Sequence, residues 1–490
     1  MLFTSPTYVL FLTTVFLIFW FLNGRNLVAR NLFLLAASYC FYGLWDWRFL
    51  GLLTGVSLVN YFIGRAIGHH EARLRRKAWL VAGLVVNLGN LIFFKYFNFF
   101  IAEFIEVSRL IGFNVNWFEL KLIIPIGISF YTFLSVSYLV DIYRKKIVPE
   151  KFLPDVLLTL SFFPIILAGP IQRPASLLPQ IQTKHLYSGQ LFADGLRQIL
   201  WGLFAKLVIA DNCAPYVDRI FSGCHTFSGS TLLLGIVLFA IQIYADFSGY
   251  SDIAIGSAKL LGFNLMRNFA YPYFAKDIVD FWKRWHISLT SWFRDYLFLP
   301  LAFYISGKIR RQRILFVGSD LIIYAVAISF TWFLTGFWHG AMFTFIAWGL
   351  IHAASLILHR ALRKNRMKMI RRFNLRGDRM LKGFIRLITL TVIMVSGIFF
   401  RSDSVAHALE YIHNTCSLDL FVTPKILPLE MILPVLFYFG IEWMQRTKQY
   451  GLEMSTSGKP VIFRWGLYYL VIFLIFFYAN THQEFIYFQF

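Results

Sequence analysis

Charged side chains are scarce in this sequence. Of its 490 residues, 15% are charged, 58% are hydrophobic and 19% are aromatic. So few charges cannot cover the surface of a soluble globule of this length, which excludes a soluble protein. The hydrophobic residues lie in runs of about 15 to 25, the length of helix that crosses a hydrocarbon core of roughly 30 Å. The sequence therefore predicts an all-α integral membrane protein.

Cysteine is also scarce, with four residues in the whole chain. None forms a CxxC motif or a Cys/His ligand spacing, so we expect no zinc or iron–sulfur site and no bound metal. We expect Cys40 and Cys213 to be buried. Cys224 and Cys416 fall in segments predicted to lie on the external side of the membrane, where thiols can be oxidised. Two free thiols are favoured over a disulfide.

The hydrophobic runs predict a bundle of about 11 to 12 transmembrane helices. They lie at residues 6–22, 31–45, 49–63, 78–101, 122–140, 198–213, 230–257, 318–338, 341–358, 387–401, 427–443 and 464–479. Residues 6–22 lack the basic front and small-residue cleavage site of a secretory signal, so they are predicted as the first span. The Pro-interrupted run at 157–170 is predicted to be re-entrant. We interpret residues 1–490 as one membrane domain.

Orientation follows from the distribution of Lys and Arg. Segment 359–386 contains eleven Lys or Arg and one acid, and segment 64–77 contains five Lys or Arg. By the positive-inside rule both are predicted to be cytoplasmic, whereas 102–120, 402–424 and both termini are predicted to lie outside. The formal charge of +22 is attributed to this topology and to binding of anionic membrane lipids. No nucleic-acid partner is expected, because the basic residues form no recognisable binding module.

A cytoplasmic excursion predicted at 262–317 contains the stretch FWKRWHISLTSWFRDY, residues 281–296. At 100° per residue, one helical face gathers Trp282, Trp285, His286, Leu289, Trp292, Phe293 and Tyr296. The other face gathers Lys283, Arg284, Ser288, Ser291, Arg294 and Asp295. The pattern predicts one amphipathic helix at the membrane surface.

Two interpretations of this helix stay open. In the first, His286 points into the bundle while Lys283, Arg284 and Arg294 bind an anionic cytosolic ligand. In the second, the basic residues contact lipid phosphates and His286 only fills space.

Two carboxylates interrupt the span at 230–257, in the stretch IQIYADFSGYSDIAIG. A carboxylate inside a membrane is costly, so Asp246 and Asp252 are candidates for substrate binding in a cavity. The alternative is a structural hydrogen-bonding node.

His339 stands between Trp338 and Gly340, at the turn between two predicted spans. The small residues around it, among them Gly336, are expected to leave room for a substrate. Burial should keep the imidazole neutral near pH 7, the form that accepts a proton from a hydroxyl. Hydrogen bonding to a backbone carbonyl, metal ligation and proton relay are the alternatives.

Six motifs in this order resemble the membrane-bound O-acyltransferase family, in particular its bacterial alginate O-acetyltransferase branch. They are PIGISFYTFLSVSYLVDIYR at 125–144, FFPIILAGPIQRPASLLPQ at 162–180, YADFSGYSDIAIG at 244–256, NFAYPYFAKDIVDFWKRWHISLTSWFRDYL at 268–297, TGFWHGA at 335–341 and FFRSDSVAHAL at 399–409. The two signature histidines of the family match His286 and His339. The resemblance implies that His339 is catalytic, at the base of a central tunnel, with His286 supporting it and Trp338 beside the substrate.

The resemblance also implies a bacterial inner-membrane enzyme that acetylates an extracytoplasmic polysaccharide, with acetyl-CoA as donor and a periplasmic acetyltransferase as partner. His339 would be the general base, with His286 stabilising the oxyanion or orienting the thioester. A covalent acetyl-histidine relay is an alternative mechanism. A non-enzymatic transporter or channel, with Asp246, Asp252 and His339 along its path, is the alternative function.

Overall fold

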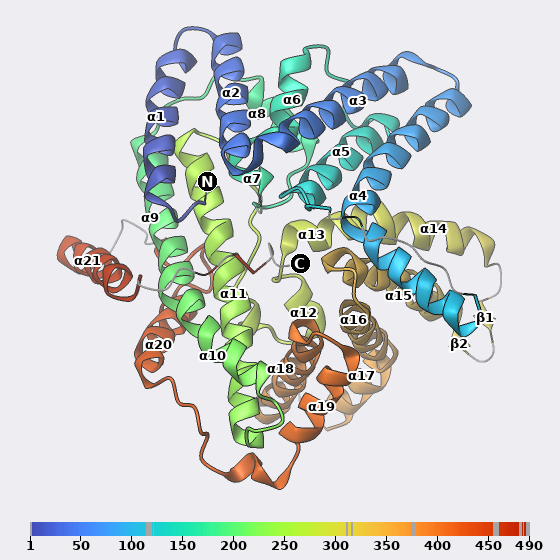
Figure 1. Ribbon diagram of the computed structural model, residues 1–490, viewed down its shortest axis with the longest axis vertical. Helices are drawn as coiled ribbons and strands as arrows, with labels where there is room; N and C mark the ends of the chain where they lie inside the picture. The colour runs from blue at the N-terminus through green and yellow to red at the C-terminus, as the bar shows by residue number, and fades with distance from the viewer. Residues whose placement is uncertain are drawn as a thin grey trace. The chain divides into compact units, whose positions relative to one another are not determined.

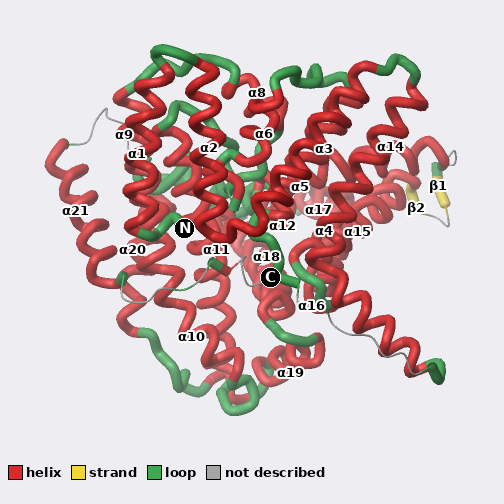
Figure 2. The backbone as a smooth tube through the Cα atoms, turned by 45° about the horizontal axis from the view of Figure 1, so that its top comes forward, coloured by secondary structure: helices red, strands yellow, loops and turns green. Residues whose placement is uncertain are grey.

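The computed structural model describes residues 2–113, 120, 122–167, 169–309, 312–314, 317–373, 378–453, 460–479, 483 and 485–486. Helix dominates this part of the chain, as Figure 2 shows, and the strand pair β1 (Arg313–Ile314) and β2 (Val317–Gly318) is antiparallel. The prediction of an all-α protein is confirmed. The predicted terminal positions at residues 1 and 487–490, and parts of the loops predicted at 102–120 and 359–386, lie outside the described residues.

The chain divides into two compact units. The first comprises Met1–Gly202 and Tyr250–Arg267, and the second comprises Leu203–Gly249 and Asn268–Phe490. Two helices, α9 and α11, contribute residues to both units. The single membrane domain over residues 1–490 stays a prediction.

The first unit begins with the long helices that Figure 1 draws in blue. Its elements are α1 (Pro6–Asn23), α2 (Leu27–Asp46), η1 (Trp47–Phe49), α3 (Leu50–His69), α4 (Arg73–Leu110), α5 (Ile128–Tyr143), α6 (Leu153–Ser161), α7 (Phe163–Ile166), α8 (Pro174–Ile181) and most of α9 (Gly189–Phe204). The side chain of Ser5 caps α1 by accepting a hydrogen bond from the backbone N–H of Tyr8 at 3.2 Å.

The second unit contains the helices of the predicted active site. Its elements are η2 (Ala205–Ala210), α10 (Asp211–Ser222), most of α11 (Gly229–Leu260), η3 (Pro272–Phe274), α12 (Ile278–Trp282), α13 (Ile287–Phe293), η4 (Arg294–Phe298), α14 (Leu299–Lys308), β1, β2, α15 (Ser319–His339), α16 (Phe343–Ala361), α17 (Arg363–Arg372), α18 (Arg379–Arg401), α19 (Val405–Thr415), η6 (Leu418–Phe421), α20 (Leu429–Met444) and α21 (Val461–Tyr478).

Among the described residues, eight helical stretches are long and apolar enough to cross a membrane. They are Pro6–Asn23, Leu27–His69, Arg73–Leu110, Gly229–Leu260, Ser319–His339, Phe343–Ala361, Arg379–Arg401 and Val461–Tyr478. The predicted spans at 122–140, 198–213 and 427–443 also fall on helices, but these are shorter or interrupted. The chain is therefore a polytopic helical membrane protein.

The run predicted to be re-entrant forms two short helices. α6 ends at Ser161, the chain turns at Phe162, and α7 spans only Phe163–Ile166, with Pro164 in its first turn. At 1.5 Å per residue neither helix reaches across a hydrocarbon core of roughly 30 Å. Both Phe162 and Phe163 are fully buried, so this irregular backbone is covered by protein.

The prediction of one amphipathic helix over 281–296 is wrong. α12 ends at Trp282 and α13 begins at Ile287, because the N–H of Ile287 donates to the carbonyl of Asn268 at 2.8 Å. A continuous helix would direct that N–H to the carbonyl four residues earlier. Ser288, assigned by the helical period to the polar face, is buried. The helical periodicity of a sequence cannot reveal a hydrogen-bond acceptor, here Asn268, that lies so many residues before its donor.

Close packing joins α15 to α16, which lie side by side in Figure 1. A Cβ atom on Gly336 would lie 2.2 Å from the carbonyl oxygen of Phe345, and one on Gly349 would lie 2.3 Å from that of Trp332. A Cβ atom on Gly340 would meet the ring of Phe345 at 2.2 Å. The expectation that Gly336 and Gly340 leave room for a substrate is therefore wrong, because α16 occupies that space.

All four cysteines are free thiols. Cys213 is buried as expected, whereas Cys40 is exposed, so the prediction that it is buried is wrong. Cys40 lies on a face of α2 that the surrounding helices leave uncovered.

Candidate active site

His339 is the last residue of α15 and is buried in a group of aromatic rings. Its ring centroid lies 4.8 Å from that of Trp338, 4.9 Å from that of Trp348 and 5.1 Å from that of Phe400. The helix stops here because Gly340 adopts an extended conformation, with φ −172° and ψ 158°. The turn and the rings together hold the imidazole in one place.

His286 occupies the turn between α12 and α13 in the left-handed conformation, with φ 42°. Such a conformation is unusual for a residue with a side chain and persists only where its surroundings enforce it. Asn268 does so: its backbone carbonyl accepts from the N–H of Ile287, and its side-chain Oδ1 lies 2.9 Å from Nδ1 of His286. The hydroxyl of Ser288 donates to the same Oδ1 at 2.9 Å.

The contact with Asn268 fixes the tautomer of His286. An amide oxygen only accepts, so Nδ1 carries the proton and Nε2 keeps its lone pair. Burial lowers the pKa of His286 to about 3. The ring is therefore neutral throughout the physiological range.

Both histidines line one pocket with a volume of about 260 Å³. Lys283 and Arg294 line it as well. Most of its other walls are apolar, contributed by Val279, Trp282, Trp285, Leu289, Phe293, Phe298, Ile328, Trp332, Trp348 and Leu356. Four side chains predicted from the sequence as site residues thus meet in one place. A largely apolar pocket with a few converging polar groups is the usual form of a small-molecule site.

The three basic residues predicted to bind an anion differ in placement. Lys283 and Arg294 are exposed at the pocket, and the side chain of Arg294, 62% exposed, also pairs with Asp295 at 2.8 Å. Arg284 is directed elsewhere: its Nε bonds Asp280 at 3.0 Å and its Nη1 bonds a backbone carbonyl. Arg284 stabilises the turn, and its predicted role in binding is untested.

Trp338 lies close to both histidines. Its ring centroid is 4.8 Å from that of His339 and 6.4 Å from that of His286. It is not among the residues that line the pocket. Trp338 thus packs near both imidazole rings, and its predicted place beside the substrate stays a prediction.

Asp246 takes part in a buried charge cluster in the second unit. Nζ of Lys206 lies 2.7 Å from Asp246 and 2.8 Å from Asp211, and it donates to the carbonyl of Gln483 at 3.1 Å. The second carboxylate oxygen of Asp246 accepts from the N–H of Ile486 at 2.7 Å. These contacts match the structural node that the sequence left as the alternative to substrate binding.

Asp252 belongs to the first unit. Its Oδ1 accepts from Nε2 of Gln198 at 2.7 Å. The substrate-binding role predicted for it stays a prediction.

Sequence reasoning missed several residues of the site. Asn268 gave no signal, because its partner His286 is distant in sequence. Trp348 was overlooked because an aromatic residue in a span is usually packing, yet its ring lies 4.9 Å from both His339 and His352. His352, in α16, is buried, and its Nε2 lies 3.0 Å from the hydroxyl of Ser396.

Residues 152–405 match the profile of the membrane-bound O-acyltransferase family. This match covers both histidines of the pocket. The chain belongs to the membrane-bound O-acyltransferase family.

Relatives of this O-acyltransferase have related names. The probable alginate O-acetylase of Pseudomonas aeruginosa is 36% identical over 406 residues, which cover 82% of this chain and 72% of that protein. The peptidoglycan O-acetyltransferase of Helicobacter pylori is 33% identical over 452 residues, covering 86% and 80%. The teichoic acid D-alanyltransferase of Bacillus subtilis is 30% identical over 237 residues, covering 48% and 58%.

Membership of this family decides between the two functions considered from the sequence, acyl transfer and transport. The chain is an O-acyltransferase, and the alternative of a non-enzymatic transporter or channel is wrong. Intramembrane carboxylates and a buried histidine fitted both functions, and the family match separates them.

Proposed function

We propose that the chain moves an acetyl group from cytosolic acetyl-CoA to a hydroxyl of an extracytoplasmic polysaccharide, such as alginate or another cell-surface glycan. The supporting observation is that His286, His339, Lys283 and Arg294 line one pocket. The relatives named as acetylases of alginate and peptidoglycan support the substrate class. The bacterial inner membrane, and a periplasmic acetyltransferase as partner, belong to the same proposal.

His339 serves as the general base. Its neutral imidazole takes the proton of the acceptor hydroxyl while the oxygen attacks the thioester carbonyl. The tetrahedral intermediate collapses, the C–S bond breaks, and the imidazolium returns its proton to the leaving CoA thiolate. The aromatic rings around His339 exclude water that would otherwise hydrolyse the thioester.

His286 orients the reaction. Since Nδ1–H is bonded to Asn268, the imidazole presents only the lone pair of Nε2 to other partners. A lone pair cannot donate to an oxyanion, so of the two roles considered for His286 the structure favours positioning over oxyanion stabilisation.

Lys283 and Arg294 bind the donor. Acetyl-CoA carries phosphate groups, and these two exposed cations lie at the same pocket as His339. Most of the other residues that line the pocket are apolar and suit an acyl thioester arm. This assignment places Lys283 and Arg294 toward the cytosol.

The test is acetyl transfer from labelled acetyl-CoA by His339→Gln, at matched amounts of membrane-inserted protein. Glutamine keeps hydrogen-bonding ability but cannot act as a base near pH 7, so we expect transfer to fall about 10² to 10⁴-fold. Near-normal transfer would overturn the assignment of His339. Quenching the wild type without acceptor separates the mechanisms, because label retained on His339 would indicate the covalent relay.

A further inference from the structure

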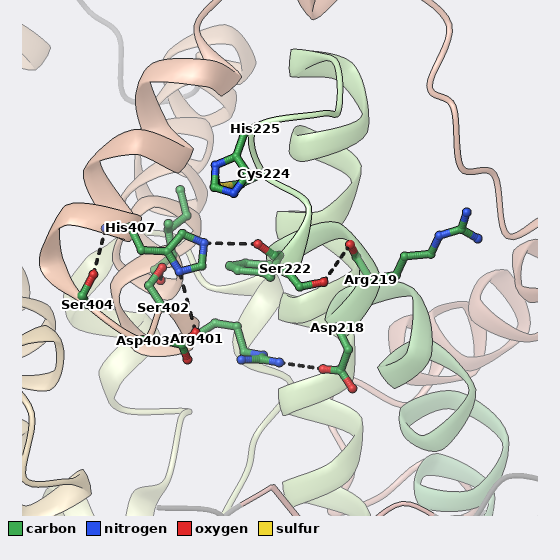
Figure 3. A network of polar contacts seen from close by, with 12 residues as sticks. Asp218, Arg219, Ser222, Cys224, His225, Arg401, Ser402, Asp403, Ser404 and His407 are labelled. Carbon is green, nitrogen blue, oxygen red and sulfur yellow. Dashed lines mark hydrogen bonds and ion pairs between the residues drawn. The ribbon is translucent and has the colours of Figure 1, made fainter.

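Three side chains of types that can ligate a metal ion converge where the loop after α10 meets α19. Sγ of Cys224 lies 3.4 Å from Nδ1 of His225, and the same Nδ1 lies 2.8 Å from Oε1 of Glu410. All three donor atoms lie within 4.8 Å of one another. Figure 3 shows Cys224 and His225 beside the polar network that joins the end of α10 to α19.

The spacing suits a tetrahedral ion. Zinc–sulfur bonds of about 2.3 Å and zinc–nitrogen bonds of about 2.0 Å place the two donors about 3.5 Å apart. The observed separation of Sγ and Nδ1 is 3.4 Å. The distance from Nδ1 of His225 to Oε1 of Glu410 is shorter, at 2.8 Å, which is the length of a hydrogen bond. Glu410, with a side chain 46% exposed, is free to rotate and widen it.

The surrounding contacts hold the thiol in place. Cys224 is 1% exposed, and its carbonyl accepts from Nδ2 of Asn414 in α19 at 3.2 Å. Nζ of Lys425 donates to the carbonyl of Thr226 at 3.2 Å, which fixes the other end of the loop. The side chain of His225 is 64% exposed, so an ion has a path from solvent.

The charge at the site favours a cation. Glu410 contributes a carboxylate and Cys224 a sulfur that binds metals as the thiolate, so the two side chains can present two negative charges to one ion. A divalent cation neutralises the charges of the thiolate and the carboxylate together.

Against the expectation from the sequence that no metal is bound, we propose that Cys224, His225 and Glu410 bind one divalent transition-metal ion of the zinc class. As the metal bonds form, the thiol proton leaves to solvent. The proton that Nδ1 of His225 donates to Glu410 also leaves to solvent, and the ring binds through Nδ1 as the neutral tautomer with its proton on Nε2. The fourth position is open to water. Such an ion joins the loop after α10 to α19, and this role is independent of the acyl transfer proposed above.

The experiment uses the full-length protein, purified in detergent, stripped with a chelator and dialysed against Zn²⁺. We expect about one zinc per chain, and a thiolate-to-cobalt absorption band when Co²⁺ replaces Zn²⁺. Cys224→Ser should abolish the band and weaken zinc retention about tenfold or more. Cys416→Ser is the matched control, because Cys416 is an exposed thiol outside the group, and it should behave as the wild type.

Wild-type protein that retains no zinc above a buffer blank would overturn the proposal. Equal zinc affinity in the wild type and in Glu410→Gln would also overturn it, because His225 and Glu410 would then form an ordinary ion pair. A size-exclusion profile of each variant shows whether a loss of zinc binding comes from unfolding of the protein. The zinc content of the wild-type protein tests the proposal even if every variant unfolds.

Discussion

At the scale of single residues, the position of His286 depends on Asn268. One amide oxygen of that side chain bonds both His286 and Ser288, and the backbone carbonyl of Asn268 sets the turn. We expect Asn268→Ala to lower kcat for acetyl transfer by about 10²-fold, because small displacements of a positioned group are costly, and to leave KM for acetyl-CoA nearly unchanged. Ser288→Ala, which removes the second donor only, is the control and should retain most activity. Equal losses in both variants would mean that the network is merely structural.

The buried imidazole of His286 also predicts how stability depends on pH. Its pKa is lowered to about 3 in the folded protein, against 6.5 for the free side chain, so protons bind the unfolded state first as the pH falls. Its contribution is complete above pH 6.5 and is lost as the pH falls from 6.5 toward 3. Between pH 6.5 and 5 we expect a loss of about 2 kcal/mol. Unfolding midpoints in detergent should fall more steeply in the wild type than in His286→Gln, and equal slopes would contradict the prediction.

Lys283 and Arg294 are expected to act on donor binding. A phosphate contact made equally in the ground and transition states changes KM rather than kcat. Lys283→Gln and Arg294→Gln should therefore raise KM for acetyl-CoA while kcat stays near the wild-type value. If the two cations only contact lipid, both variants should show normal kinetics at a reduced protein level.

At the scale of elements, the contact between α15 and α16 positions the pocket. At Gly349 the backbone of α16 lies directly against the backbone of α15 at Trp332. Trp332 and Trp348 both line the pocket. A methyl group on Gly349 must push the helices apart, so Gly349→Ala should cost about 1–3 kcal/mol of stability and reduce transfer. Gly383→Ala in α18 is the control, because its Cβ would meet nothing within 4 Å. A Gly349→Ala protein as stable as the Gly383→Ala protein would contradict this account.

The sequence predicted long elements well and short ones poorly. Apolar runs placed helices at α15 and α16, and His339 at their turn, because a long run has only one stable form in lipid. The sequence did not predict the break between α12 and α13, because the regular helical pattern of polar and apolar residues gives no sign of the hydrogen bond from Ile287 to Asn268. It also misjudged Gly336, since a glycine in a helix pattern does not reveal whether a cavity or another helix lies beside it.

At the scale of the whole molecule, the topology predicted from Lys and Arg can be tested with a natural thiol. Cys416 is exposed and lies in segment 402–424, which is predicted to be external. In a Cys40→Ser background, an impermeant maleimide should label Cys416 in intact spheroplasts. Arg371→Cys, in the basic segment and in a background that also carries Cys416→Ser, should react only after the membrane is opened. Labelling of Arg371→Cys but not Cys416 would reverse the orientation.

The buried cluster of Lys206, Asp211 and Asp246 bears on how the chain enters the membrane during synthesis. α11 carries Asp246 within a candidate span, and a charge at the centre of an isolated helix costs about 2.5–3.5 kcal/mol in membrane insertion. Its partner Lys206 precedes it in the chain, so the cation has already left the ribosome when α11 emerges. Pairing neutralises both charges before either must face lipid alone. α11 is therefore expected to leave the translocon together with the helical segment that carries Lys206, so that a single ion pair links the order of synthesis to the order of insertion.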